Sequence, residues 1–105
     1  MPPQSTAAPH LRLDNYTEST AVLLEFREAA RQDGVSSQAL TIQSFRIAYQ
    51  YGRRTLTKTQ RRRLLLCAHG MTVGEIAGAE HVSHQNVSKS IAAAKRKLIR
   101  FMKRL

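Results

Sequence analysis

The pattern of apolar and polar positions is clearest in the second half of the chain, where residues that can cap a helix precede each apolar segment. Thr57 is followed three residues later by Gln60, and Thr72 is followed three residues later by Glu75. Each pair can form a capping box, which satisfies backbone N–H groups at a helix start. Ser83 supplies a third N-cap. We therefore expect three helices in this half.

The caps predict helices over 58–69, over 73–79 and from 84 onward, and Gly70 ends the first of them because glycine accepts positive φ. A short helix, a tight turn and a second capped helix are the outline of a helix-turn-helix. The last helix is expected to extend to about residue 103, which is long for this motif.

The stretch from Leu56 to Leu98 resembles the DNA-binding module that sigma-factor region 4 shares with LuxR-type regulators. The matching positions include Leu56-Thr57, Gly70-Met71-Thr72, Glu75-Ile76-Ala77, Val82-Ser83, Val87, Ile91 and Lys97-Leu98, with no insertion or deletion. A weaker likeness, confined to Asn86 to Ile91, is to small plasmid repressors of the KorA type.

The resemblance implies that the helix beginning at residue 84 lies in the major groove of DNA. The positions that would then contact bases are His84, Gln85, Asn86, Ser88 and Lys89. Primary sigma modules carry Arg and Glu at several of these positions, and this chain does not. Gln or Asn can still pair with adenine, and Lys with guanine. For His84, a base contact and a role at the helix start remain alternatives.

Contacts to DNA phosphates are expected from a second set of residues. Its members are Thr72, Ser83, Arg61, Arg62, Lys95 and Arg96. Arg61 and Arg62 lie in the first turns of a predicted helix, where positive charge opposes the helix dipole unless a negative partner compensates. DNA phosphate is one such partner, and an acidic face around Glu25 and Glu28 is the alternative.

Apolar residues continue along the last helix at spacings of three and four, as in a coiled-coil seam. The last part of this seam consists of Leu98, Phe101, Met102 and Leu105. It can pair with a second copy of the chain to form a homodimer, or it can dock on the helix expected at 38–51. The pattern does not decide between the two.

Composition divides the chain into three parts. Residues 1–13 contain all three prolines and no amphipathic pattern, which predicts a flexible arm. Residues 14–52 predict a pair of helices that either complete the core or form a dimer or partner surface. Residues 53–105 contain the helix-turn-helix region.

The two helices of the first half are divided by a stop signal at Gly34. Apolar residues repeat at helical spacing from about residue 17 up to this glycine. A second helix is expected to open at Ser36 or Ser37 and to end at Gly52.

Charge is distributed unevenly between the halves of the chain. The formal net charge is +10, and residues 53–105 contribute +11 while residues 1–52 contribute −1. A field of this sign attracts nucleic acid by counterion release. The single cysteine suits a reducing compartment, and neither a signal peptide nor a membrane span is recognisable. We therefore expect a cytoplasmic location, in a prokaryotic cell or its phage or plasmid.

Together these patterns predict an all-α protein of about five helices with a C-terminal helix-turn-helix and a long last helix. It is expected to bind double-stranded DNA sequence-specifically and to regulate transcription, as a homodimer on a palindromic or repeated site. The alternatives are an adaptor that docks on RNA polymerase or another protein with weak DNA binding, and a binder of structured RNA. An enzyme, a cofactor and a metal site are not expected, because no acid–base pair, partnered nucleophile, phosphate loop or ligand set is recognisable.

Overall fold

The computed structural model describes residues 15–104, which form an all-helical fold. Its elements are α1 (Asn15–Gln32), α2 (Ile42–Gly52), the 3-10 turn η3 (Arg53–Thr55), α3 (Lys58–Ala68), α4 (Val73–Glu80) and α5 (His84–Lys103). The expected all-α class with about five helices and a long last helix is confirmed. The flexible arm expected over 1–13 lies outside the described residues, as does Leu105.

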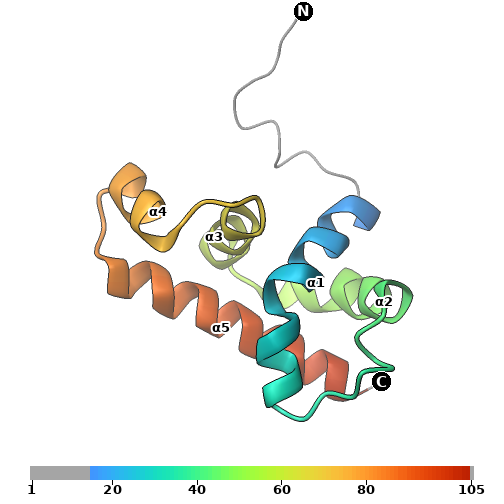
Figure 1. Ribbon diagram of the computed structural model, residues 1–105. Coiled ribbons are helices and arrows are strands. Elements are labelled where there is room, and N and C mark those ends of the chain that lie inside the picture. The colour runs from blue at the N-terminus through green and yellow to red at the C-terminus, as the bar shows by residue number, and fades with distance from the viewer. Residues whose placement is uncertain (1–14, 105) are drawn as a thin grey trace, which may run out of the picture.

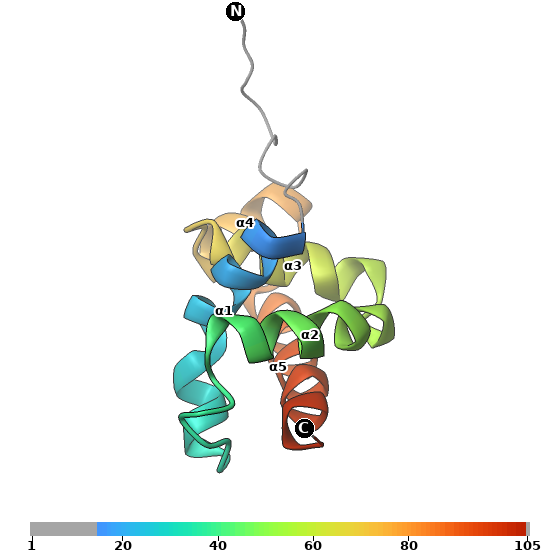
Figure 2. The same cartoon turned by 90° about the vertical axis from the view of Figure 1, so that its right-hand side faces the viewer.

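The longest helix, α5, runs along one side of the molecule, and the other helices pack above it (Figure 1). Helix α4 lies beside the first turns of α5, whereas α1 and α2 lie beside its second half. Seen from the side, α2 crosses in front of α5, and α1 lies next to both (Figure 2). The helix-turn-helix region and the first two helices are therefore joined along α5, and α1 also packs against α3.

A single hydrophobic core draws side chains from all five helices. Its buried members include Val22, Leu23, Phe26 and Ala30 of α1, Phe45, Ala48 and Tyr49 of α2, Leu64 and Leu65 of α3, Ile76 and Ala77 of α4, and Val87, Ile91, Ala94, Leu98, Ile99 and Met102 of α5. The rings of Phe26 and Phe45 lie 4.8 Å apart, so an aromatic contact joins α1 to α2.

The three predicted helix caps are confirmed. The Thr57 hydroxyl accepts the Gln60 N–H at 3.0 Å, and the Gln60 side chain accepts the Thr57 N–H at 3.1 Å. An equivalent capping box opens α4, and the Ser83 hydroxyl accepts the backbone N–H three residues later at 3.1 Å. After α3, Gly70 adopts a φ of +100°, as expected for a helix-ending glycine.

The predicted start of the second helix is wrong. It was expected at Ser36 or Ser37, but α2 begins at Ile42, after Thr41. The Thr41 hydroxyl accepts the backbone N–H of residue 44 at 3.2 Å and so acts as the N-cap. Ser36 and Ser37 instead begin a short turn, in which their carbonyls accept the N–H groups of Ala39 and Leu40 at 3.1 and 3.2 Å. The N-cap that starts the helix is therefore Thr41 and not one of these serines.

Candidate nucleic-acid interface

The first turns of α5 present an exposed polar surface. Val87 and Ile91 point into the core and are 0% and 6% exposed. Gln85 and Lys89 lie on the opposite side of the helix, since residues two positions apart in a helix face in nearly opposite directions. All five side chains expected to contact bases, namely His84, Gln85, Asn86, Ser88 and Lys89, are exposed.

His84 differs from the other four because its ring lies against α4. A methyl group on Gly74 would stand only 3.2 Å from the Cε1 atom of His84. The absence of a side chain at Gly74 therefore leaves room for the ring beside the first turn of α4. Of the two alternatives for His84, this position corresponds to packing at the helix start.

The position of α5 is fixed from behind by Arg63, whose side chain is only 10% exposed. Its guanidinium donates to the Glu80 carboxylate at 2.8 Å, to the Ser90 hydroxyl at 2.6 Å and to the Asn86 carbonyl at 3.4 Å. One side chain of α3 thus joins the last residue of α4 to the second turn of α5. Charge-assisted hydrogen bonds of this kind are stronger than neutral ones.

Glu80 also accepts hydrogen bonds from Arg62, at 3.2 and 3.3 Å. Burial raises the pKa of Glu80, but the hydrogen bonds and charges of Arg63 and Arg62 outweigh burial and hold this pKa below its usual range. The partners of Arg63 could not be read from the sequence.

Arg61, which was expected to contact DNA phosphate, is ion-paired within the protein. Its guanidinium donates to the Glu18 carboxylate at 3.0 to 3.2 Å, and Glu18 is 1% exposed. Arg53 donates to the same carboxylate at 3.4 Å, and the Tyr49 hydroxyl donates to it as well. Burial, followed by the hydrogen bond and charge of Glu18, raises the pKa of Tyr49 well above its usual range.

The expected partner of Arg61 was either a phosphate or an acidic face around Glu25 and Glu28. In the structure the partner is Glu18, which lies on α1 like Glu25 and Glu28 but in the first turns of this helix rather than in its middle. Glu25 pairs instead with Lys95 at 3.4 Å, and Glu28 pairs with Arg31 at 3.3 Å.

The remaining residues expected to bind phosphate differ in how far they are occupied. Arg62 and Lys95 are ion-paired, to Glu80 and Glu25. Thr72 and Ser83 are exposed, and their hydroxyls act as helix caps. Arg96 is exposed and has no ion pair among the described residues.

Exposed basic residues continue along the outer face of α5 beyond the positions expected to contact bases. Lys89, Arg96 and Arg100 follow one another along the side of the helix that faces away from the core. All three are exposed, and none forms an ion pair within residues 15–104. The helical spacing of four from Arg96 places Arg100 on the same face.

The apolar seam at the end of α5 packs within the chain. Leu98 and Met102 are 1% and 2% exposed and belong to the core. Gly52 of α2 lies so close that a methyl group there would stand 3.0 Å from Leu98 and 3.3 Å from Phe101. Of the two alternatives for this seam, the structure places it against the protein's own second helix. It therefore does not offer Leu98 and Met102 to a second copy.

No helix within residues 15–104 is long and apolar enough to cross a membrane. In the same part of the chain, no group of three His, Cys, Asp or Glu side chains is placed to hold a metal ion.

Comparisons with protein-family models, with curated proteins and with solved structures found no match to this chain.

Proposed function

We propose that the protein is a sequence-specific, double-stranded DNA-binding regulator of transcription that reads the major groove with the first turns of α5. The observation that carries this proposal is the change of chemistry along one exposed face of this helix. Its start carries the amides Gln85 and Asn86 together with Lys89, and the later turns carry the unpaired guanidinium groups of Arg96 and Arg100. Amides can discriminate base edges, and guanidinium groups bind phosphates.

The dimensions of the helix support the same assignment. Its 20 residues span about 30 Å, whereas the major groove is about 12 Å wide. Only the first turns can therefore lie against base edges, and the second half extends beyond the groove, next to the sugar-phosphate backbone. The amides Gln85 and Asn86 would thus lie against base edges, and Arg96 and Arg100 would lie next to the sugar-phosphate backbone.

The test begins with selection of bound duplexes from a random DNA pool at two salt concentrations. On the selected site, Asn86→Ala and Gln85→Ala are each expected to weaken binding by about 1 to 3 kcal/mol. On random DNA they should change binding very little, because neither removes a positive charge. Gln43→Ala is the matched control, since this exposed amide lies on α2. Equal losses on selected and random DNA would contradict base reading.

A second candidate function is an adaptor that docks on RNA polymerase or another protein. It is favoured by two exposed apolar side chains on one face of α2, Ile47 at 55% and Tyr51 at 57% exposure. Their spacing of four residues makes them neighbours on the helix surface. Three results would support this function instead. The random pool would yield no selected sequence, DNA binding would be lost at higher salt, and polymerase would co-purify with the protein but not with Ile47→Ser.

The expected homodimer needs a different surface from the α5 seam. Ile47 and Tyr51 form the apolar pair available for it on α2. The selected DNA distinguishes the oligomeric states: a two-fold symmetric motif supports a dimer, and a single unrepeated motif supports a monomer.

A further inference from the structure

We propose that the DNA backbone, where it leaves the first turns of α5, follows the edge of the molecule formed by η3 and the start of α3. Its phosphates there bind Arg54, Lys58, Arg100 and Arg104. This inference rests on the proposed function and adds to it a defined phosphate path.

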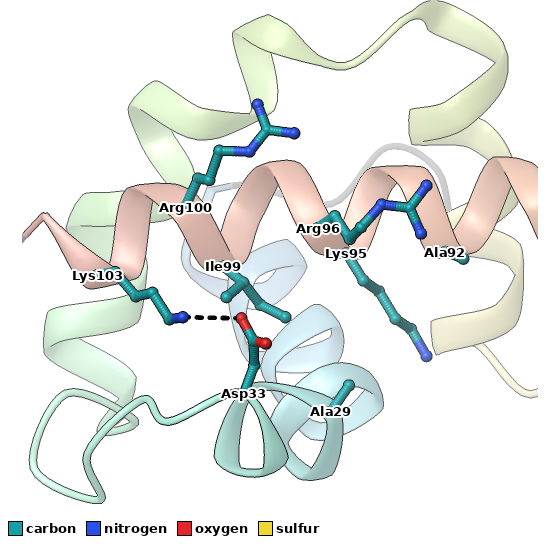
Figure 3. Close-up of a pocket in the computed structure, with 8 residues that line it drawn as sticks. All are labelled: Ala29, Asp33, Ala92, Lys95, Arg96, Ile99, Arg100 and Lys103. Atoms are coloured by element: carbon teal, nitrogen blue, oxygen red, sulfur yellow. Dashed lines mark ion pairs between the residues drawn. The ribbon is translucent and has the colours of Figure 1, made fainter.

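The second half of α5 has two edges, and on the one facing α1 both lysines are paired with carboxylates. A groove of about 390 Å³ lies between the two helices, and its lining includes Ala29 and Ile99 as well as the unpaired Arg96 and Arg100 (Figure 3). Lys103 crosses this groove and forms an ion pair with Asp33 at 3.0 Å. Lys95 on the same side pairs with Glu25 at 3.4 Å. Carboxylates that already compensate these ammonium groups also repel an approaching phosphate.

The opposite edge contains two adjoining grooves. The smaller, of about 220 Å³, is lined by Thr55, Lys97, Arg100, Phe101 and Arg104. The larger, of about 470 Å³, has Arg54, Lys58 and Arg61 among its lining residues. Residues that flank Thr55 in sequence line the larger groove, so the two grooves meet at η3. Among the described residues, no carboxylate-bearing side chain lines either of them.

The cations on this edge divide into those held by carboxylates and those that are not. Arg53 and Arg61 donate to Glu18, and Arg62 donates to Glu80. Within residues 15–104, Arg54 and Lys58 form no ion pair. Charges without a carboxylate partner are the ones that bind phosphate at full strength.

Arg100 and Arg104 extend the same free charge onto α5, and they too form no ion pair in the described part of the chain. Arg100 lines both the groove facing α1 and the smaller groove on the opposite edge, and its guanidinium points away from Asp33 (Figure 3). Lys97 donates to the Thr55 carbonyl at 2.9 Å, a neutral partner that leaves its charge uncompensated. The basic surface is therefore continuous from α5 to η3.

Two of the free guanidinium groups are also oriented by aromatic rings. Arg54 lies over the ring of Tyr51, with its Cζ atom 6.0 Å from the centroid, and Arg104 lies over Phe101 at 5.5 Å. A ring contacts the face of a guanidinium and leaves its N–H groups available at the edge. Such stacking lowers the entropy that the side chain loses on binding phosphate.

The experiment compares the salt dependence of duplex binding for two double variants that remove the same charge. Arg54→Gln with Lys58→Gln removes two cations from the η3 edge. Arg31→Gln with Lys103→Gln removes two cations from the α1 side, where each is ion-paired. Affinity for a duplex containing the selected site is measured from 50 to 200 mM salt. Thermal unfolding of each variant verifies that it remains folded.

The slope of log K against log salt becomes shallower by about 0.9 for each DNA phosphate that the protein no longer neutralises. We expect a decrease of about 2 in the magnitude of the slope for the η3 variant, and less than half of that for the α1 variant. The selected sequence should be unchanged, because these residues bind phosphates. Arg100→Gln with Arg104→Gln should behave like the η3 variant and replaces it if that variant does not fold.

Equal decreases in the two variants would overturn the phosphate path, since they would reflect net charge alone. A larger decrease in the α1 variant would overturn it as well and move the backbone to the other edge. Failure of the unaltered protein to bind duplex DNA would refute the proposed function, and the phosphate path with it.

Discussion

Replacement of Glu18 by Gln is expected to destabilise the protein by about 2 to 3 kcal/mol. The Glu18 carboxylate is 1% exposed and accepts hydrogen bonds from Tyr49, Arg53 and Arg61. Loss of one partner from a fully buried ion pair costs about 3 to 5 kcal/mol, because the other charge is left uncompensated. The side chains of Arg61 and Arg53 are 41% and 30% exposed, so each can turn partly toward water. This exposure places the expected cost below the buried range.

The assay is urea unfolding at neutral pH, followed by circular dichroism and compared with Glu28→Gln. Glu28 lies on the same helix and is paired with Arg31, but its side chain is 70% exposed. Its replacement should change the free energy of unfolding by less than about 0.5 kcal/mol, as is usual for exposed ion pairs. If Glu18→Gln and Glu28→Gln unfolded at the same urea concentration, the claim that the hydrogen bonds of Glu18 stabilise the fold would be refuted.

The remaining predictions concern a close helix contact and a carboxylate. Gly52→Ala should destabilise the protein by about 1 to 2 kcal/mol, because the added methyl group would stand 3.0 Å from Leu98. Gly78→Ala, where nothing lies within 4 Å, should instead stabilise α4 by up to about 1 kcal/mol; thermal unfolding tests both, and equal shifts would contradict the packing argument. Arg63 and Arg62 hold the pKa of Glu80 in the folded protein below its value in the unfolded chain. The stability that ionised Glu80 contributes should therefore be complete above about pH 4.3 and be lost as pH falls through the folded pKa. The difference in unfolding free energy between the unaltered protein and Glu80→Gln, measured from pH 7 to pH 3, should therefore shrink at the acid end, and a constant difference would count against this assignment.

The parts of the fold that the sequence predicts are those set by short-range chemistry. The capping boxes at Thr57 and Thr72 join residues three apart, so both partners are visible in one short stretch. Gly70 and Gly34 end helices through their own backbone conformation, with φ of +100° and +91°. Helix ends of this kind need no knowledge of the tertiary structure.

The parts that the sequence does not predict depend on partners far along the chain. Arg61 and Glu18 are 43 residues apart, and Arg63 and Glu80 are 17 apart. An arginine of unknown partner looks the same whether it faces phosphate or a buried carboxylate, so the ion pairs at the start of α3 could not be predicted from the sequence.

The α5 seam illustrates a different limit. Leu98 and Met102 repeat at helical spacing, and this pattern identifies a buried face but not what covers it. The decisive feature is Gly52, which lets α2 approach the seam closely. A glycine at a helix end is read as a stop signal, and its role in helix contact becomes visible only in the packed structure.

The carboxylate of Glu18 has a consequence for how the protein folds. It lies in the first turns of the described chain and binds Arg61 at the start of the helix-turn-helix region. A fragment beginning at residue 53 would leave that arginine without its carboxylate and would expose Leu98 and Met102 to water. The helix-turn-helix region is thus not an autonomous module that was appended to two further helices. Residues 15–104 pack around one hydrophobic core, in which α5 contacts all four other helices. Removal of the first two helices is therefore expected to destabilise the remaining three.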